Sequence, residues 1–201
     1  MIKAPTIKAA LPSLLLSLLA LSTLPAQAAW QLDGERSRVE ATVIAITPEG
    51  PSPHTHQIRD LHGDIDAEGR LRLPLRLAQA DVLDRLGPLP PWLSGFTDRP
   101  LATLTTQLAP QRLDSLAVGD SRVETLTMRV EANGRHHQTP VPLRFSRLDG
   151  TTIRVTAAER LVLDGQELMA NPTLRGVLLM LGYEQIGDEV PVSLDALLID
   201  R

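Results

Sequence analysis

Apolar and polar residues alternate with a period of two along most of the chain. In the segment LRLPLRLAQ, the odd-numbered leucines from Leu71 to Leu77 share one face, while Arg72, Pro74 and Arg76 occupy the other. A strand with one buried face has this pattern. Pro74 has no N–H to donate to a ladder, so we predict that this strand lies at a sheet edge or is bulged there.

Five further segments alternate in the same way, and each gives a predicted inward face. Their apolar positions are Val39, Ala41, Val43 and Ala45; Leu126, Met128, Val130 and Ala132; Val141, Leu143 and Phe145; Ile153, Val155 and Ala157, followed by Leu161 and Leu163; and Val190, Val192, Leu194 and Ala196. Turn signals such as Asn133-Gly134 and Asp149-Gly150 separate the segments. Alternation of this kind favours an antiparallel sheet, which must close or stack to protect its edges. We therefore predict an all-β, mainly antiparallel fold that forms a closed or nearly closed barrel.

One or two short helices are predicted between the strands. Asn171 is placed to cap a helix, Pro172 takes its first position and Gly182 can end it. This helix has an apolar face wide enough to be nearly surrounded by contacts, made up of Leu174, Val177, Leu178, Leu179, Met180 and Leu181. The second candidate is Asp81 to Leu86. The connection GPLPPWLSGF follows it and brings Trp92 and Phe96 together, either as a plug over one barrel end or as an entrance lid.

The first 28 residues have the features of a secretory signal peptide. Lys3 and Lys8 supply the positive start, an apolar run follows, and Ala26-Gln27-Ala28 is a small-residue cleavage site. The apolar run is much shorter than the roughly 20 residues that a membrane-spanning helix needs. We expect cleavage after residue 28, a barrel domain over residues 29–201, and a periplasmic location.

Composition then excludes several chemistries. Removing Lys3 and Lys8 from the 20 basic residues leaves 18 against 24 acidic ones, a net charge of −6, so nucleic acid is not an expected partner. The chain has no cysteine and no lysine after Lys8, which excludes a thiol nucleophile, a Schiff-base lysine and a phosphate-loop lysine in the mature protein. It also lacks a Gly-x-Ser-x-Gly elbow and a His-Glu-x-x-His motif. We predict a protein that is not an enzyme and needs no cofactor.

Five motifs between Trp30 and Leu198 are similar, in the same order, to those of one known family. The opening WQLDGERSRVEATV is similar to an aromatic-x-hydrophobic-Asp start followed by Ser-x-Val-x-aromatic-x-Val. IRDLHGDIDAEG is similar to Lys-Asp-Phe-Ser-Gly-x-Ile-Asp, DRPLATLTT to Tyr-Pro-x-Ala-x-Phe, and NGRHHQTPVPLRF to a His-Gly-x-Thr-x-Pro-Val hairpin. IGDEVPVSLDALL matches the family ending. By the order of these motifs along the mature chain, the protein resembles the YceI family of secreted bacterial lipid-binding proteins.

The chain departs from the family pattern at several positions. Arg36-Ser37 stands where the family commonly has His-Ser, Ala41 where an aromatic residue follows, and Ile44-Ala45 where Lys-His follows. Aromatic residues make up only 2% of the chain, and Leu, Val and Ala take the inward positions instead. Hydrophobic volume and pattern suffice for the fold, so these departures leave the fold expected and the identity of the ligand open.

The resemblance implies a lipocalin-like eight-stranded β-barrel that binds a long apolar chain, such as an isoprenoid, a quinone or a similar lipid. An eight-stranded barrel is just wide enough to fill itself with side chains or to hold one slim ligand. Small inward residues, among them Ala132, would leave room for it. The predicted ligand-binding residues are Ala41, Val43, Ala45, Leu73, Leu75, Trp92, Phe96, Leu126, Met128, Val130, Val141, Leu143, Phe145, Val155, Ala157, Leu174, Leu178, Val192 and Leu194. A membrane surface and a second copy of the chain are further candidate partners.

The histidines give the alternative interpretation, a structural or metal-handling envelope protein with a filled barrel. His136 and His137 are predicted in an exposed hairpin loop, and as neighbours they could not easily share a metal ion. His54 and His56, in PSPHTHQ, can share a face, but His62 is the only other histidine in reach and a site needs a third ligand and usually a fourth. We interpret PSPHTHQ as a polar, proline-rich loop, with a weak metal site as the alternative.

Overall fold

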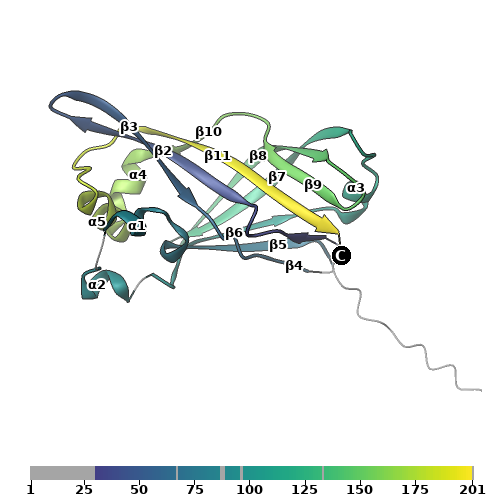
Figure 1. Ribbon diagram of the computed structural model, residues 1–201, viewed down its shortest axis with the longest axis horizontal. Helices are drawn as coiled ribbons and strands as arrows, with labels where there is room; N and C mark the ends of the chain where they lie inside the picture. The colour runs from purple at the N-terminus through teal and green to yellow at the C-terminus, as the bar shows by residue number, and fades with distance from the viewer. Residues whose placement is uncertain (1–29, 67, 87–88, 96, 133, 201) are drawn as a thin grey trace, which may run out of the picture.

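A computed structural model describes residues 30–66, 68–86, 89–95, 97–132 and 134–200, apart from the side chains of Asp64, Trp92 and Leu93. Within these residues, eleven strands form one curled sheet (Figure 1). The strands are β1 Trp30–Leu32, β2 Arg38–Thr47, β3 Gly50–Ile58, β4 Asp64–Ile65, β5 Arg70–Arg76, β6 Pro100–Gln107, β7 Ser121–Ala132, β8 Arg135–Arg147, β9 Thr152–Ala157, β10 Leu161–Asp164 and β11 Glu189–Asp200.

The sheet follows the order β3-β2-β11-β9-β8-β7-β6-β5-β4, and β1 and β10 pair with β11 beside this path. Each of these pairings is antiparallel. Long hairpins join β2 to β3 and β7 to β8. The predicted all-β, antiparallel, lipocalin-like barrel is confirmed.

The two ends of the curled sheet meet at a short seam, which consists of residues 57–59 and residues 79–81. The Asp81 N–H donates to the Gln57 carbonyl oxygen at 2.9 Å, and the Arg59 N–H donates to the Gln79 carbonyl oxygen at 2.9 Å. These bonds link the end of β3 to the segment after β5, so eight strands from β3 to β5 enclose the interior.

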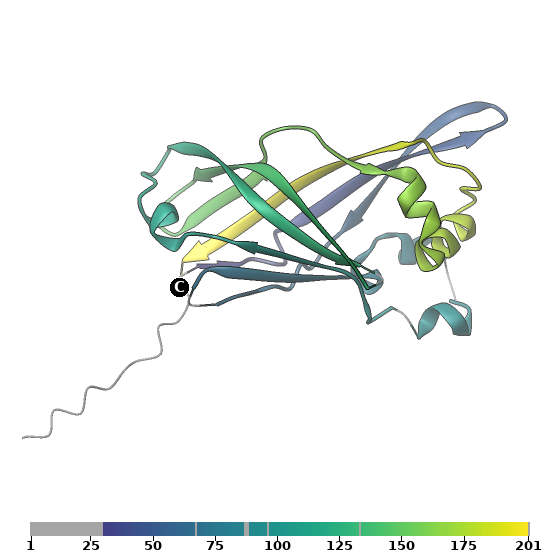
Figure 2. The ribbon, with the colours of Figure 1, turned by 180° about the vertical axis from the view of Figure 1, so that it is seen from behind.

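Short helices gather at one end of the barrel, which we call the helix end (Figures 1 and 2). They are the 3₁₀ helix η1 Leu77–Gln79 and the α-helices α1 Val82–Leu86, α2 Pro91–Ser94, α4 Gly165–Ala170 and α5 Pro172–Met180, while α3 Pro110–Asp114 lies at the opposite end. The helices predicted after Asp81 and at Pro172 are confirmed. The expected number is wrong, because α3 and α4 span five and six residues, too few for a helical period to appear in the sequence. Among the described residues, no helix is long and apolar enough to cross a membrane.

The caps of α5 explain its bounds. The Asn171 side chain accepts hydrogen bonds from the Thr173 and Leu174 N–H groups, as the cap position requires. Gly182 has φ of 85°, a conformation that ends the helix at low cost in a residue without a Cβ.

The predicted alternation appears directly in β5 and β7. Along β7, the side chains of Leu126, Met128 and Val130 turn inward while their neighbours are exposed.

Pro74 lies beyond the two-residue strand β4, which pairs only with Arg72 and Leu71, and a register shift follows between Leu75 and Arg76. β5 is therefore not the edge strand, because β4 lies beyond it, but within the described residues Pro74 itself has a ladder partner on β6 alone and the irregularity follows one residue later.

The packed core is divided into three clusters. The largest lies toward α3 and includes Leu143, Phe145 and Ile153. The second, built around Val43 and Tyr183, and the third, which joins Leu77, Val82 and Val177, belong to the helix end. One inward assignment is wrong: Leu163 is 47% exposed, because β10 sends only Leu161 toward the core.

Candidate functional site

The middle of the barrel contains inward apolar side chains that are only partly covered. Leu75, Leu104, Val130 and Val192 are half-buried, and none of them belongs to the three packed clusters that the described residues form. Leu104 and Val130 are direct cross-strand partners on β6 and β7. We call these four residues the central band.

The ladder beside the central band is incomplete. β8 pairs with β9 from Leu143 to Arg147, and the Ala158 N–H then donates to the Pro142 carbonyl oxygen at 2.9 Å. From Arg135 to Val141, the ladder pairs of the described residues join β8 to β7 alone. On the other side of this interruption, β10 pairs with β11. Val130 therefore lies one strand from the interruption on one side, and Val192 lies one strand from it on the other.

The predicted ligand-binding residues fall into three groups. Packed core positions hold Val43, Ala45, Leu73, Val141, Leu143, Phe145, Val155 and Leu178. Half-buried positions hold Ala41, Leu75, Leu126, Met128, Val130, Ala157, Leu174, Val192 and Leu194. The Trp92 side chain and the whole of Phe96 lie outside the described residues. Contact with a ligand stays a prediction for all of them. Leu104 was missed, although it stands at the position of the phenylalanine in the Tyr-Pro-x-Ala-x-Phe motif to which DRPLATLTT is similar.

A polar cluster lies on the inward face at the helix end, where the sequence predicted a loop. The segment PSPHTHQ belongs to β3, and His54 and His56 pair with Val43 and Ala41 of β2. The prediction of a loop is wrong, because Pro51 and Pro53 fall on the exposed face of an edge strand, where proline is tolerated. The expectation that the two histidines share a face is confirmed.

Tyr183, which follows α5, holds this cluster together. Its hydroxyl lies 3.2 Å from His56 Nε2, and its ring stacks on His54 with the ring centroids 4.8 Å apart. Asp81 approaches from the start of α1, with Oδ1 3.5 Å from His56 Nδ1. Burial lowers the pKa of His56 although the Asp81 carboxylate opposes part of that shift, and burial raises the pKa of Tyr183. At neutral pH the imidazole is therefore uncharged and the phenol keeps its proton.

His136 and His137 do not belong to this cluster. Both lie in β8 and are exposed. The predicted loop is wrong, because β8 already begins at Arg135, which pairs directly with Ala132 of β7. Within the described part of the chain, no three His, Cys, Asp or Glu side chains are grouped closely enough to hold a metal ion.

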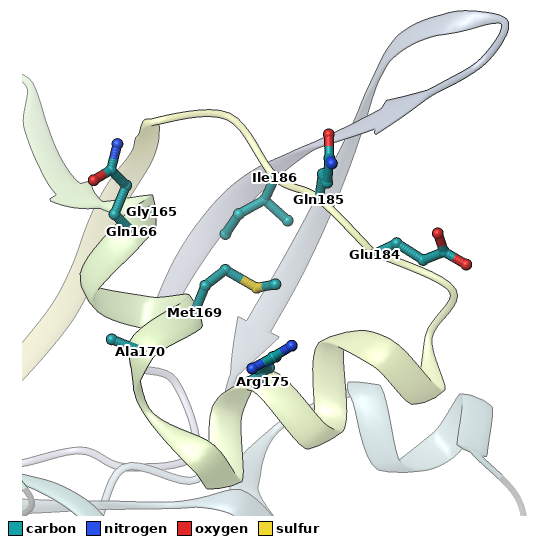
Figure 3. A pocket seen from close by; sticks show the side chains of 8 residues that line it. All are labelled: Gly165, Gln166, Met169, Ala170, Arg175, Glu184, Gln185 and Ile186. Carbon is teal, nitrogen blue, oxygen red and sulfur yellow. The ribbon is translucent and has the colours of Figure 1, made fainter.

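A separate hollow of about 440 Å³ lies outside this cluster, between α4, α5 and residues 184–186 (Figure 3). Met169 and Ile186 face each other across it, while Gln166 and Glu184 point away. Arg175 of α5 completes the lining. The hollow is thus lined by both apolar and polar side chains.

Comparison with known proteins places the fold. No family model matches the chain, and no curated protein matches it in sequence. Among solved structures it is similar to a polyisoprenoid-binding domain from Saccharophagus degradans implicated in plant cell wall breakdown, with a TM-score of 0.71 and 20% identity over 87% of this chain and 99% of that one. It is also similar to BcnA of Burkholderia cenocepacia, with a TM-score of 0.50 and 14% identity over 83% of this chain and 99% of that one. The chain therefore has the YceI-like, lipocalin-like fold of these proteins, as its sequence motifs predicted.

Proposed function

We propose that the protein binds a long apolar ligand, an isoprenoid, a quinone or a similar lipid, inside its barrel and acts as a non-catalytic carrier or scavenger in the periplasm. The observation that carries this proposal is the central band: inward leucine and valine side chains that lack a packed neighbour cluster and lie beside an interrupted ladder. Side chains in a filled barrel would pack to native density at this level.

The free energy gained by burying such a ligand is large enough to drive its binding. Each buried methylene contributes roughly 0.8 kcal/mol, so about ten methylenes would offset much of the entropy lost on binding. A slim chain suits an eight-stranded interior better than a bulky ligand does, because the barrel has little width to spare. The polyisoprenoid-binding function named for the structural neighbour from Saccharophagus degradans agrees with this class of ligand.

The periplasmic location rests on the sequence of residues 1–28, which lie outside the described part of the chain. The expected mature protein begins at Ala29 or Trp30, and β1 starts at Trp30. Amino-terminal sequencing of the protein recovered from the periplasm tests this; material that still begins at Met1 would contradict it.

Binding is best tested by native mass spectrometry of the mature protein before and after delipidation, followed by titration with a polyprenyl alcohol. A hydrophobic mass that leaves on denaturation and a saturable return of binding are expected. The matched variants are Val130→Trp, which fills the central band, and Val123→Trp, which alters a valine on the same strand that is 47% exposed. We expect a loss of at least about tenfold in affinity for the first, because the added ring occupies the ligand's volume, and none for the second.

The filled barrel gives different results in the same experiment. No apolar mass would be recovered, no saturable binding would appear, and Val130→Trp would chiefly destabilise the protein by overpacking. That combination would overturn the carrier proposal in favour of a structural role in the envelope.

A further inference from the structure

The buried polar cluster at the helix end contains two atoms that face each other without forming a hydrogen bond of good geometry. His56 is 9% exposed, and its Nδ1 and the Oδ1 of Asp81 have no hydrogen-bond partner within the described structure. They lie 3.5 Å apart, too far for a good hydrogen bond to each other. A buried polar atom left unpaired is costly, so such a pair in a folded protein calls for an explanation.

The tautomer of His56 follows from its two polar neighbours. The Asp81 carboxylate lies beside Nδ1, which favours the neutral imidazole that carries its proton on Nδ1 and makes this atom a donor. Burial raises the pKa of Tyr183, so its hydroxyl keeps a proton that it can donate to Nε2, 3.2 Å away. Asp81 Oδ1 is an acceptor. The two unpaired atoms therefore present one donor and one acceptor side by side.

We propose that His56 and Asp81 bind the uncharged hydroxyl group of an apolar ligand, a long-chain alcohol, whose chain extends into the barrel. The inference rests on the proposed function and names the head group of its ligand. A hydroxyl accepts from Nδ1–H and donates to Oδ1 at the same time, which satisfies both atoms. A carbonyl head would satisfy Nδ1 alone, and a phosphate or carboxylate head would face the Asp81 carboxylate.

The surroundings suit an amphiphile of this kind. His56 pairs with Ala41, and His54 pairs with Val43, on the inward face of β2 and β3. Val43, Leu178 and Val190 form the packed apolar cluster that contains Tyr183. The polar atoms are thus set in an apolar wall, the arrangement by which binding pockets fix one end of a ligand.

Three probes that share a chain separate the possibilities: geranylgeraniol, the hydrocarbon with the same carbon skeleton, and geranylgeranyl diphosphate. Their affinities for the delipidated full-length mature protein are measured by calorimetry or by competition. We expect the alcohol to bind roughly tenfold or more tightly than the hydrocarbon, since two hydrogen bonds to otherwise unpaired atoms are gained. The diphosphate is expected to bind more weakly than the alcohol.

Asp81→Asn tests the charge of the acceptor, because it replaces the carboxylate with a neutral amide of the same shape, which accepts more weakly. It leaves the main-chain bond of the seam in place, since the Asp81 N–H makes that bond. The preference for the alcohol over the hydrocarbon should fall, and the diphosphate should gain affinity. Asp84→Asn is the control: it makes the same change on α1 in a side chain that is 71% exposed and pairs with Arg59. His56→Phe, which keeps a ring beside Tyr183, should bring the alcohol and the hydrocarbon to nearly equal affinity.

Equal affinities for alcohol and hydrocarbon in the wild-type protein would overturn the inference while leaving the carrier function intact. Tighter binding of the diphosphate, lost in Arg85→Gln, would also overturn it and would assign the head group to the exposed end of α1. If none of the three probes binds, the inference and the proposed function fail together.

Discussion

Two leucine truncations measure whether the barrel is packed through its middle. Leu143→Ala removes a side chain that is 4% exposed and lies in the cluster toward α3. A buried Leu→Ala change costs roughly 2–5 kcal/mol, and for this fully enclosed position we expect about 3–4 kcal/mol. Leu104 is half-buried and lies outside the three clusters that the described residues form, so Leu104→Ala should cost about 1–2 kcal/mol. Both changes occur in strands, so the loss of β-propensity cancels in the comparison.

Urea unfolding followed by tryptophan fluorescence provides the assay, since Trp30 is 2% exposed in the same cluster as Leu143 and its environment changes on unfolding. With an m-value of about 2 kcal/mol/M, a difference of about 2 kcal/mol separates the two midpoints by roughly 1 M. The protein is delipidated first, because a bound ligand would add its own stabilisation. Equal costs for the two truncations would refute the reasoning, since they would mean that the central band is packed as tightly as the core.

Two further predictions concern the fold and the polar cluster. Gly69→Ala should destabilise the protein far more than Gly119→Ala. Both glycines have positive φ, but a Cβ at Gly69 would lie 2.1 Å from the Leu108 carbonyl oxygen, whereas no atom lies within 4 Å of a Cβ at Gly119. Thermal unfolding of the two variants compares their stabilities. The pH dependence of stability should reflect His56, whose pKa burial lowers from the ordinary 6.5. The unfolded chain then takes up a proton at a higher pH than the folded chain, so the free energy of unfolding falls as the pH drops below about 6.5. Urea midpoints between pH 5 and 8 should show a shallower slope in His56→Phe, and an unchanged slope would contradict this assignment.

Period-two alternation predicted the inward faces of the long strands because pleating fixes it locally. Val43, Leu143 and Ala196 were placed inside by this rule, and all three are buried. The rule also has a local limit. Leu163 alternates correctly in sequence but is exposed, since burial depends on what covers a strand and not only on the side to which its residue points.

The polar cluster could not be predicted in the same way, because long-range contacts assemble it. Tyr183 is 127 residues from His56 in the chain, and Asp81 reaches His56 only because the seam brings α1 against β3. Sequence spacing indicated that His54 and His56 share a face. The spacing gave no indication of Tyr183, whose ring stacks on His54 and whose hydroxyl hydrogen-bonds to His56.

The prolines of β3 have a consequence for the solubility of the whole molecule. The β2–β3 hairpin extends beyond the rest of the barrel, and β3 forms the edge of the sheet before it reaches the seam (Figure 1). An extended edge of this kind offers free N–H groups to the strands of other molecules and is a common origin of aggregation. Pro51 and Pro53 lie within this segment and have no N–H, and a ladder tolerates proline only where no bond within the sheet is donated. Two groups that could start intermolecular pairing are therefore missing from this edge strand.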